Sequence, residues 1–209
     1  MIAGAIIAGG LSSRMQEGGV AGDKFLQPLG TGSVITHVIR RIEPQVQTLV
    51  VNANSNDSRL TDLGIPVIKD ISAQHGGPLI GILTALLQAQ AFPLLLTTAA
   101  DTPFLPPDLA DRLLSRRSET GARVVLASSL ERIHPIFGLW ETGLADELSA
   151  WLASTNRASV LAFAEHIGFE AVEFPLALAG DSSETYDPFF NINRPDDLVA
   201  ARRLAEGME

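Results

Sequence analysis

The first 24 residues constrain the fold more strongly than any other part of the chain. The run Ile2–Ala8 is apolar and interrupted by glycine, which is typical of a buried parallel strand. Gly9 and Gly10 follow at its carboxyl end, where the lack of a Cβ atom lets the backbone turn sharply and lets its amides approach an anion. Arg14 and Lys24 add positive charge to the same loop. The stretch predicts a strand followed by a phosphate-binding loop, and a plain tight turn is the alternative interpretation of the glycines alone.

This loop differs from the two commonest nucleotide-binding motifs. Lys24 lies between Asp23 and Phe25, so the glycine before the lysine and the serine or threonine after it in a Walker A loop are missing. Gly30 and Gly32 are not followed by the third glycine of a G-x-G-x-x-G motif. A nucleotide site in this chain must therefore use another kind of loop.

Strand-like and helix-like segments alternate along the chain. The expected strands are 2–8, 48–52, 67–70, 93–100, 123–127, a run ending at 140, 170–174 and 189–193. The expected helices are 34–42, 78–87, 108–117, 144–152, 159–167 and a last one from 195, while 180–186 is polar and loop-like. No linker or repeat divides the 209 residues. The pattern predicts one α/β domain over residues 1–209, a three-layer α/β/α sandwich with a doubly wound, mostly parallel sheet.

Polar residues end three of the expected strands. They are Asn52, Asp70 and Asp101. Open α/β sheets bind ligands at the carboxyl ends of their strands, so Asp101, at the end of a central parallel strand, is a candidate ligand contact. By themselves, Asn52 fits a residue that shapes a turn and Asp70 an ordinary strand-end acid. Asp101 follows the strand that looks most buried, and Mg²⁺ binds one or two carboxylates together with phosphate oxygens and water. We therefore expect Asp101 to hold Mg²⁺; a helix-capping role is weakened because Asp108 is better placed to cap the next helix.

Composition excludes several classes of protein. The net charge of −9 argues against a nucleic-acid partner, since there is no basic footprint for phosphates. The absence of cysteine excludes disulfides and thiolate metal sites. No apolar run is long enough to span a membrane, and Ile2–Ala8 is too short and lacks the basic flank of a signal peptide. We expect a cytoplasmic protein without a membrane partner.

Several motifs together carry a resemblance to a known family. Ala8-Gly9-Gly10-x-Ser12-x-Arg14-Met15, followed by Asp23-Lys24, resembles the signature loop of nucleotidyltransferases that join a nucleoside triphosphate to a phosphorylated acceptor, most closely the molybdenum cofactor guanylyltransferases (MobA type). The family's later motifs follow in the same order: Val51-Asn52-Ala53-Asn54, Gly77-Pro78-Leu79-x-Gly81, Asp101-Thr102-Pro103 and Asn191-x-Asn193-x-Pro195. The chain departs from the family at Ile7 in place of leucine, Gln16 in place of glycine, Ile80 in place of alanine, and in the Gln16–Gly22 insert.

The resemblance implies a reaction and a set of residues. The reaction is transfer of GMP from GTP to the terminal phosphate of molybdopterin, with release of pyrophosphate. The implied catalytic residues are Arg14, Lys24 and Asp101, with Mg²⁺ on Asp101. The implied nucleotide contacts are Ile7, Ala8, Gly9, Gly10, Lys24, Asn52, Asp70, Pro78, Leu79 and Asp101. The implied acceptor contacts are Asn191, Asn193 and His134, although the His134-Pro135 pair also resembles a purely structural turn. The implied protein partners are other molybdenum cofactor biosynthesis proteins or apo-molybdoenzymes.

Two other functions remain open at this point. A sibling enzyme, such as a molybdenum cofactor cytidylyltransferase, would use CTP, and the Ile80 substitution lies in the expected base pocket. A nucleotide-binding accessory protein without turnover is favoured by the unusual Gln16–Gly22 insert. The retention of Arg14, Lys24 and Asp101 argues against that alternative, because binding alone does not need all three residues.

Overall fold

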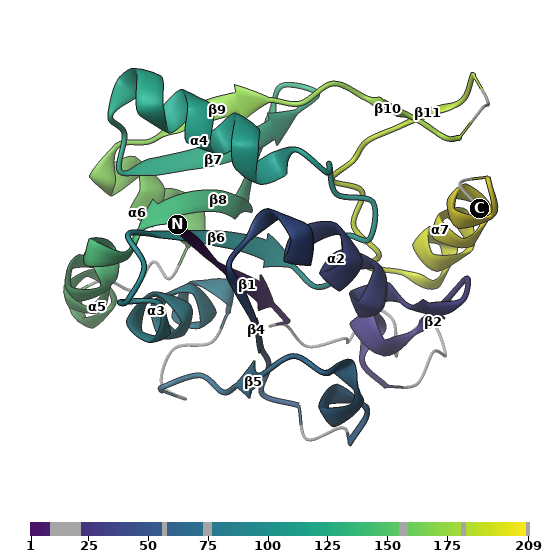
Figure 1. Cartoon of the computed structure of the whole chain (residues 1–209), viewed down its shortest axis with the longest axis horizontal. Helices are drawn as coiled ribbons and strands as arrows, with labels where there is room; N and C mark the ends of the chain where they lie inside the picture. Colours follow the sequence, from purple (N-terminus) through teal and green to yellow (C-terminus); the bar gives the residue numbers. More distant parts are fainter. Residues whose placement is uncertain (9–21, 56–57, 73–76, 155–158, 181–182, 208–209) are drawn as a thin grey trace.

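The computed structural model describes residues 1–8, 22–55, 58–72, 77–154, 159–180 and 183–207, which form a three-layer α/β/α sandwich (Figure 1). Its central sheet has the strand order β5-β4-β1-β6-β8-β7-β9. These strands are β1 (Ile2–Ile7), β4 (Thr48–Asn52), β5 (Val67–Ile68), β6 (Leu94–Ala99), β7 (Val124–Ser129), β8 (Arg132–Glu141) and β9 (Glu170–Glu173). The predicted fold class is confirmed.

Strands β1 and β6 form the middle of the sheet. Each has six residues, all buried, as expected for parallel strands that are covered on both faces. Strand β1 pairs in parallel with β4 on one side and β6 on the other, and β5 extends the parallel part beyond β4. Ile7 is in register with both Asn52 and Ala99. The carboxyl ends of these strands therefore meet at one edge of the sheet, as the sequence predicted.

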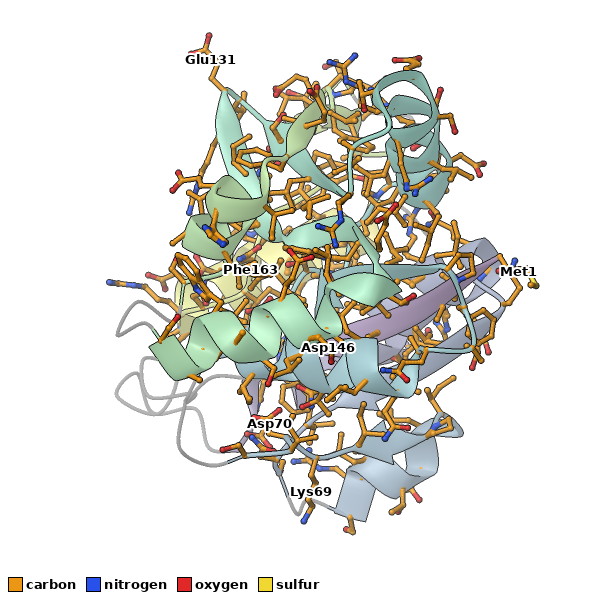
Figure 2. The ribbon with its side chains drawn as sticks, turned by 90° about the vertical axis from the view of Figure 1, so that its left-hand side faces the viewer. Met1, Lys69, Asp70, Glu131, Asp146 and Phe163 are labelled. Carbon is orange, nitrogen blue, oxygen red and sulfur yellow. The ribbon has the colours of Figure 1, made fainter. Side chains whose placement is uncertain are left out.

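Strand β8 is antiparallel to both of its neighbours, β6 and β7. A tight turn joins β7 to β8 through Leu130 and Glu131, both with positive φ, and Glu131 lies at its tip (Figure 2). The β7–β8 register then shifts, with Ala127 opposite His134 but Leu126 opposite Gly138. The prediction of a turn at His134-Pro135 is wrong, because both residues belong to β8. Pro135 lies where the β7–β8 pairing is interrupted. Proline, which has no amide proton to donate, is tolerated in a sheet at such a position.

Helices cover both faces of the sheet (Figure 1). One face packs against α2 (Val34–Ile42) and α4 (Leu109–Thr120), and the other against α3 (Pro78–Gln88), α5 (Ala145–Ser154) and α6 (Val160–Ile167). Helix α2 buries its apolar residues and has Ser33 as its N-cap, whose amide donates to the Thr36 hydroxyl (2.8 Å). Among the described residues, no helix has the length and apolar character needed to cross a membrane.

The last helix, α7 (Pro195–Glu206), packs on a small apolar cluster with the hairpin β2 (Pro28–Leu29)–β3 (Gly32–Ser33) and with Ile192. The segment 189–193 is not the predicted strand. It begins in a turn in which the Phe190 amide donates to the Asp187 carbonyl (3.0 Å). It then lies against the end of β6 through a bond from the Ile192 amide to the Asp101 carbonyl (2.9 Å). Part of the predicted loop 180–186 instead forms β11 (Thr185–Tyr186), which pairs with β10 (Ala177–Leu178).

Candidate active site

A pocket of about 230 Å³ lies at the edge of the sheet where the parallel strands end. Its walls come from the ends of β1 and β6, the 3-10 helix η1 (Lys24–Leu26), the first residue of α3, and the segment before α7. The lining residues include many of the predicted ones: Ile7, Ala8, Lys24, Pro78, Asp101, Asn191 and Asn193. The structure therefore gathers residues from distant parts of the chain around one cavity.

Lys24 and Asp101 form an ion pair in this pocket, between Nζ and Oδ2, and their side chains are only 17% and 11% exposed. The Lys24 ammonium also donates to Asn193 Oδ1 (2.8 Å). Removing two charges from water is costly, and such a pair is weak evidence for a stabilising role. The carboxylate and the amide oxygen together hold the Lys24 ammonium at the wall of the pocket.

Thr102 links the end of β6 to the segment before α7. It is fully buried, its hydroxyl donates to Asn191 Oδ1 (2.9 Å), and the same hydroxyl lies 3.3 Å from Asp101 Oδ1. Asn191 and Asn193 thus reach the same pocket, as predicted from their alternate spacing, although the element that carries them is not a strand. The two asparagines are fixed by Thr102 and Lys24 respectively.

A second polar cluster lies at the ends of β4 and β5. Asn52 is buried and donates to Asp70 Oδ1 (2.9 Å), while Asn54 donates to Asp70 Oδ2 (2.7 Å). The Asp70 amide returns a bond to Asn54 Oδ1 (3.0 Å). Both oxygens of this carboxylate are therefore held by amides from the V-N-A-N motif. The predicted neighbours Asn52 and Asp70 are brought together, and the arrangement fixes polar groups beside the first turn of α3.

The structure explains why the last position of the G-P-L-x-G motif, Gly81, is a glycine. A Cβ atom at this position would lie 2.3 Å from Asn52 Oδ1 and 3.1 Å from Ile7 Cγ2. We expect Gly81→Ala to displace the Asn52 side chain, to lower the free energy of unfolding by about 1–3 kcal/mol through overpacking, and to weaken nucleotide binding. Thermal unfolding and calorimetric titration with GTP measure the two effects.

Gly143→Ala is the matched control, since a Cβ atom there meets no atom within 4 Å. It should leave both quantities unchanged. Wild-type nucleotide affinity in Gly81→Ala would show that the position of Asn52 does not matter for the ligand.

The structure at the start of α3 differs in part from the predicted base pocket. Pro78 lines the cavity, but Leu79 and Ile80 are buried in the core between α3 and the sheet. The Ile80 substitution therefore does not alter the shape of the pocket by direct contact. Because the Leu79 side chain is buried, only the main chain of this residue remains for contact with a ligand. Its amide is suited to such a contact, since first-turn amides of a helix lack intrahelical partners. Part of the signature loop, Gly9, Gly10 and Arg14, and the insert up to residue 21 lie outside the described residues.

His134 lies in a separate, adjoining pocket of about 310 Å³. This pocket shares Asn191 and Asn193 with the first one and adds Arg132, Asp187 and Asp197, with Phe189 and Phe190. Burial is the main cause that lowers the pKa of His134 below its usual value of 6.5. Asp187 opposes this shift, Arg132 adds to it, and Glu173 opposes it. The predicted acceptor residues thus lie around two cavities that meet at the two asparagines.

The residues present also fit a divalent cation. Within the described part of the chain, no three histidine or acidic side chains group together as a protein-only metal site. Asp101 offers one nearly buried carboxylate at the cavity, which suits a cation that completes its shell with ligand phosphates and water. The role of Asp101 as a metal ligand stays a prediction.

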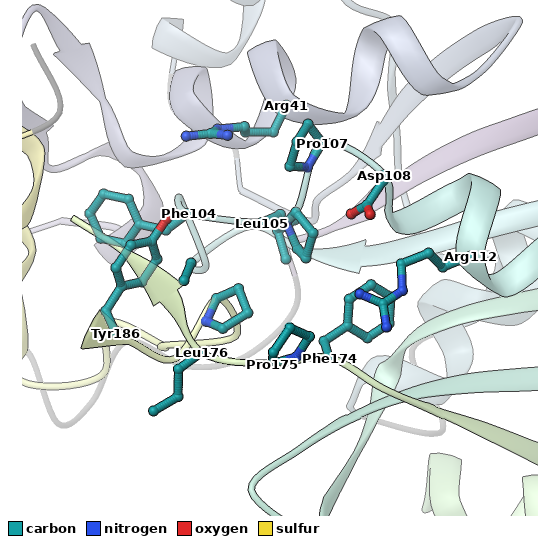
Figure 3. Close-up of a pocket in the computed structure, with 13 residues that line it drawn as sticks. Arg41, Phe104, Leu105, Pro107, Asp108, Arg112, Phe174, Pro175, Leu176 and Tyr186 are labelled. Atoms are coloured by element: carbon teal, nitrogen blue, oxygen red, sulfur yellow. The ribbon is translucent and has the colours of Figure 1, made fainter. Parts of the chain in front are cut away.

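A third pocket, of about 360 Å³, lies beside the segment that follows Asp101 and contains none of the predicted residues (Figure 3). Aromatic and proline side chains dominate its lining, and the Arg112 guanidinium lies 4.2 Å from the ring centre of Phe174. It combines no lysine with a carboxylate at a strand end. The chemistry is therefore assigned to the pocket at the sheet edge.

Sequence reasoning missed several residues that shape the site. Thr102 belonged to a recognised motif but had no assigned role, and Asn54 was quoted only as part of V-N-A-N. Ser55 donates to Asp23 Oδ2 (2.6 Å), which ties the residue before Lys24 to the end of β4. Ser129, which bonds His134, gave no signal because it is an ordinary strand residue in the sequence. Only the three-dimensional pairing of strands reveals such contacts.

Comparison with known proteins gives one family. The model of the MobA-like NTP transferase domain matches residues 4–168. The molybdenum cofactor guanylyltransferase of Brucella ovis is 58% identical over 208 residues, covering 100% of this chain and 94% of the relative. The protein of the same name from Brucella melitensis biotype 2 has the same identity and coverage.

Solved structures show the same fold. The molybdopterin-guanine dinucleotide biosynthesis protein A of Archaeoglobus fulgidus superimposes with a TM-score of 0.72 and 20% identity, and the match covers 100% of both chains. A nucleotidyl transferase from Methanothermobacter gives a TM-score of 0.73 at 19% identity, covering 100% of this chain and 99% of the other. At these identities the structural likeness supports the fold alone.

Proposed function

Because this chain belongs to the MobA-like NTP transferase family, we propose that it is a molybdenum cofactor guanylyltransferase. It transfers GMP from GTP to the terminal phosphate of molybdopterin and releases pyrophosphate. The full-length identity to the Brucella guanylyltransferases supports this activity over that of more distant nucleotidyltransferases. GTP and molybdopterin are its substrates, and the cytoplasm, where GTP is available, is its proposed location. Other cofactor biosynthesis proteins or apo-molybdoenzymes are its proposed protein partners.

One observation carries the proposal more than any other: the ion pair of Lys24 and Asp101 at the end of β6, with Asn193 on the same ammonium. Nucleotidyl transfer needs one group that neutralises phosphate charge and another that holds a cation on the phosphates. The pair supplies both within one cavity. A net charge of −9 makes such a local cation important, because most of the protein surface repels a triphosphate.

The reaction asks little covalent chemistry of the protein. An oxygen of the molybdopterin phosphate attacks the α-phosphorus of GTP, the new phosphorus–oxygen bond forms, and the bond to the pyrophosphate oxygen breaks. The attacking oxygen is already an anion, so no general base is needed. Positioning and charge neutralisation provide the rate enhancement. Lys24 neutralises negative charge on the triphosphate as pyrophosphate departs.

Asp101 is the proposed ligand of Mg²⁺. When bound there, Mg²⁺ supplies Lewis-acid polarisation of the phosphate oxygens. Asp101 fixes the cation relative to the sheet, while Thr102 holds the backbone segment and Asn191 against it. Lys24, which pairs with Asp101 in the described structure, exchanges this carboxylate for a phosphate when nucleotide binds.

The signature loop completes the proposed phosphate site. Ala8 lines the cavity, and Gly9, Gly10 and Arg14 follow it in the sequence. We assign the amides of Gly9 and Gly10 to the triphosphate and Arg14 to the leaving pyrophosphate, on the strength of the motif; the Ala8 amide, which belongs to the same motif, already donates to the Asn52 carbonyl (2.8 Å). Glycine at both positions removes side chains that would keep the phosphates away from the amides.

The nucleoside lies on the other side of the cavity in this proposal. Ile7 and the start of α3, at Pro78 and Leu79, form the apolar and main-chain wall. Asn52 and Asp70 provide amide and carboxylate groups in a fixed orientation. Guanine offers N–H donors on one edge and a carbonyl acceptor, so it can pair with first-turn amides of α3 and with carboxylate or amide oxygens nearby.

The acceptor is assigned to the adjoining pocket. His134 lines that pocket, and Asn191 and Asn193 line both. A molybdopterin bound there would present its phosphate between the two asparagines, next to Lys24 and Asp101. In this proposal the two substrates lie side by side, with the nucleotide toward β4 and the acceptor toward β8.

Nucleotide selectivity tests the proposal directly. We expect calorimetric titration with Mg²⁺ present to show binding of GTP at least about tenfold tighter than CTP or ATP, a difference of roughly 1.4 kcal/mol, because only guanine offers the donor pattern described above. Turnover with molybdopterin should follow the same order. A preference for CTP would identify a cytidylyltransferase instead, and nucleotide binding without turnover would identify an accessory protein.

A further inference from the structure

A chain of hydrogen bonds lies behind His134 in the acceptor pocket. Ser129 at the end of β7 has its hydroxyl 2.7 Å from His134 Nε2 and donates to Asp187 Oδ1 (2.8 Å). The strand register explains the first contact, since Ala127 is opposite His134 and Ser129 projects to the same face two residues later. Asp187 Oδ1 also accepts the Phe189 amide (2.9 Å), which fixes the carboxylate.

This series of hydrogen bonds determines which nitrogen of the His134 ring carries a proton. A serine hydroxyl has one hydrogen, and an ionised carboxylate accepts hydrogen bonds only. The Ser129 hydrogen therefore goes to Asp187, and the hydrogen in the contact with His134 must come from Nε2. The neutral imidazole then has an unprotonated Nδ1, because the tautomer is set by the bond that the other nitrogen makes.

The ring of His134 is also held by packing. It stacks on Phe189, with ring centres 4.7 Å apart and an interplanar angle of 20°, and meets the edge of Phe137 at 6.2 Å. His134 is 9% exposed and lines the acceptor pocket. Within the described residues, Ser129 is its one hydrogen-bond partner, so Nδ1 is the nitrogen left for a ligand.

This group of residues is not a nucleophilic triad. In a hydrolase triad the histidine takes the serine proton and the carboxylate orients the histidine. Here Ser129 lies between the other two, donates a hydrogen bond to Asp187, and is 1% exposed. The arrangement orients a histidine and activates no hydroxyl.

We propose that Ser129 and Asp187 are positioning residues of the acceptor site, which hold His134 with Nε2 protonated so that Nδ1 accepts a hydrogen bond from an N–H group of the acceptor's pterin ring. This inference rests on the proposed function, because it names the acceptor contact of the same site. A lone pair at Nδ1 favours an N–H donor over a phosphate oxygen. His134 therefore selects the pterin end of the acceptor, while Asn191 and Asn193 lie toward its phosphate.

The protonation state of His134 gives this role a pH dependence. The charged groups around the ring are Asp187 before Phe189, Arg132 on its own strand, Glu173 on β9 and Asp197 on α7. With its pKa lowered below 6.5, His134 is neutral at pH 7 and above. Protonation at lower pH puts a hydrogen on Nδ1, so the bond to the acceptor is lost as the pH falls through the pKa.

The test compares Michaelis constants for the two substrates. In Ser129→Ala, His134 loses its fixed partner, and the Michaelis constant for molybdopterin should rise about tenfold, as for one lost hydrogen bond of roughly 1.4 kcal/mol, with that for GTP unchanged. Asp187→Ala frees the Ser129 hydrogen for Nε2 and should raise the same constant. Asp187→Asn keeps an acceptor oxygen for Ser129 and should retain wild-type values. Ser128→Ala is the control, since that hydroxyl bonds Glu173 on the opposite face of the strand (2.6 Å).

Histidine NMR gives a readout that does not depend on turnover. The ¹⁵N shifts of the ring distinguish the two tautomers, and His134→Asn assigns the signal among the four histidines. We expect Nε2–H in the wild-type protein and in Asp187→Asn, and a shift toward Nδ1–H in Asp187→Ala. His134→Asn keeps an acceptor atom near the position of Nδ1. It should therefore bind molybdopterin without the additional loss of affinity at low pH that we expect for the wild-type protein. Titration of the acceptor's own phosphate affects both proteins equally.

The outcomes separate this inference from the proposed function. Failure of the wild-type protein to turn over GTP with molybdopterin contradicts the proposed function. Normal wild-type turnover, with an unchanged molybdopterin constant in Ser129→Ala or with Nδ1–H in the wild-type spectrum, overturns the role of Ser129 and Asp187. A rise in the constants for both substrates in Ser129→Ala would mean a general structural defect and would also overturn it.

Discussion

Asp101→Asn is expected to reduce kcat by about 1,000-fold, which corresponds to roughly 4 kcal/mol of lost transition-state stabilisation. The substitution keeps the size of the side chain and an oxygen for Lys24, but it removes the charge that holds a divalent cation on the phosphates. The Asp101 side chain is 11% exposed, so little solvent screens that charge. Steady-state kinetics with GTP, molybdopterin and Mg²⁺ measure the change.

The fold should survive this substitution, because Ile192 bonds the Asp101 main-chain carbonyl and not its side chain. A melting temperature within about 4 °C of wild type would confirm this, as expected for a change of roughly 1 kcal/mol in a chain of this size. Asp108→Asn is the matched control: it removes an exposed carboxylate from the same segment, at the start of α4, and should leave kcat unchanged. Turnover close to wild type in Asp101→Asn would exclude Asp101 as the metal ligand.

The parallel half of the fold was predictable because its signals are local. Strand β1 is a continuous apolar run and β6 is interrupted only by Thr97 and Thr98, and such runs imply burial on both faces. Helix α2 was predicted with its correct buried face, since residues at helical spacing are apolar from Val34 to Ile42. Asp101 was then placed by a rule of topology, because open α/β sheets bind ligands at the carboxyl ends of their strands, whereas Asn52 and Asp70 were named from the family motifs.

The errors have a different physical origin. The segment 189–193 has the alternation of a strand, but its pattern reflects two sets of partners: Phe189 and Ile192 pack in the core, while Asn191 and Asn193 face the cavity. His134-Pro135 has the composition of a turn, but the register shift between β7 and β8 accommodates it within a strand. Leu79 and Ile80 follow a motif that faces a ligand, yet the helical turn directs both side chains into the core.

Residues that act through other residues were beyond sequence reasoning. Thr102 bonds Asn191 from 89 positions away in the chain, and Asp187 acts on His134 through Ser129, which bonds that histidine. Ser129 and Asp187 are 58 residues apart and lie on a strand end and a turn with no motif of their own. The contacts of Thr102 and Ser129 with Asn191 and Asp187 depend on how the segment before α7 lies against the ends of β6 and β7, which no local pattern encodes.

Lys24→Met is expected to lower kcat by about 100-fold, or roughly 2.7 kcal/mol, while it strengthens binding of a divalent cation to the free protein. The two effects have one cause. The ammonium neutralises phosphate charge during the reaction, but without nucleotide it competes with a cation for the Asp101 carboxylate. Removing it should therefore raise the affinity for Mn²⁺, used as a paramagnetic probe of the Mg²⁺ site, by about tenfold or more, since like charges a few ångströms apart repel strongly at low exposure.

Electron paramagnetic resonance titration of Mn²⁺ into the nucleotide-free proteins measures this change, and Asp101→Asn should shift the affinity in the opposite direction. Arg40→Met, which removes an exposed cation from the last turn of α2, is the control and should change neither kcat nor Mn²⁺ affinity. A fall in kcat without tighter Mn²⁺ binding would show that Lys24 and the cation occupy separate parts of the site. The ion pair would then be a structural contact, and this result would contradict the proposal that Lys24 exchanges the Asp101 carboxylate for a phosphate.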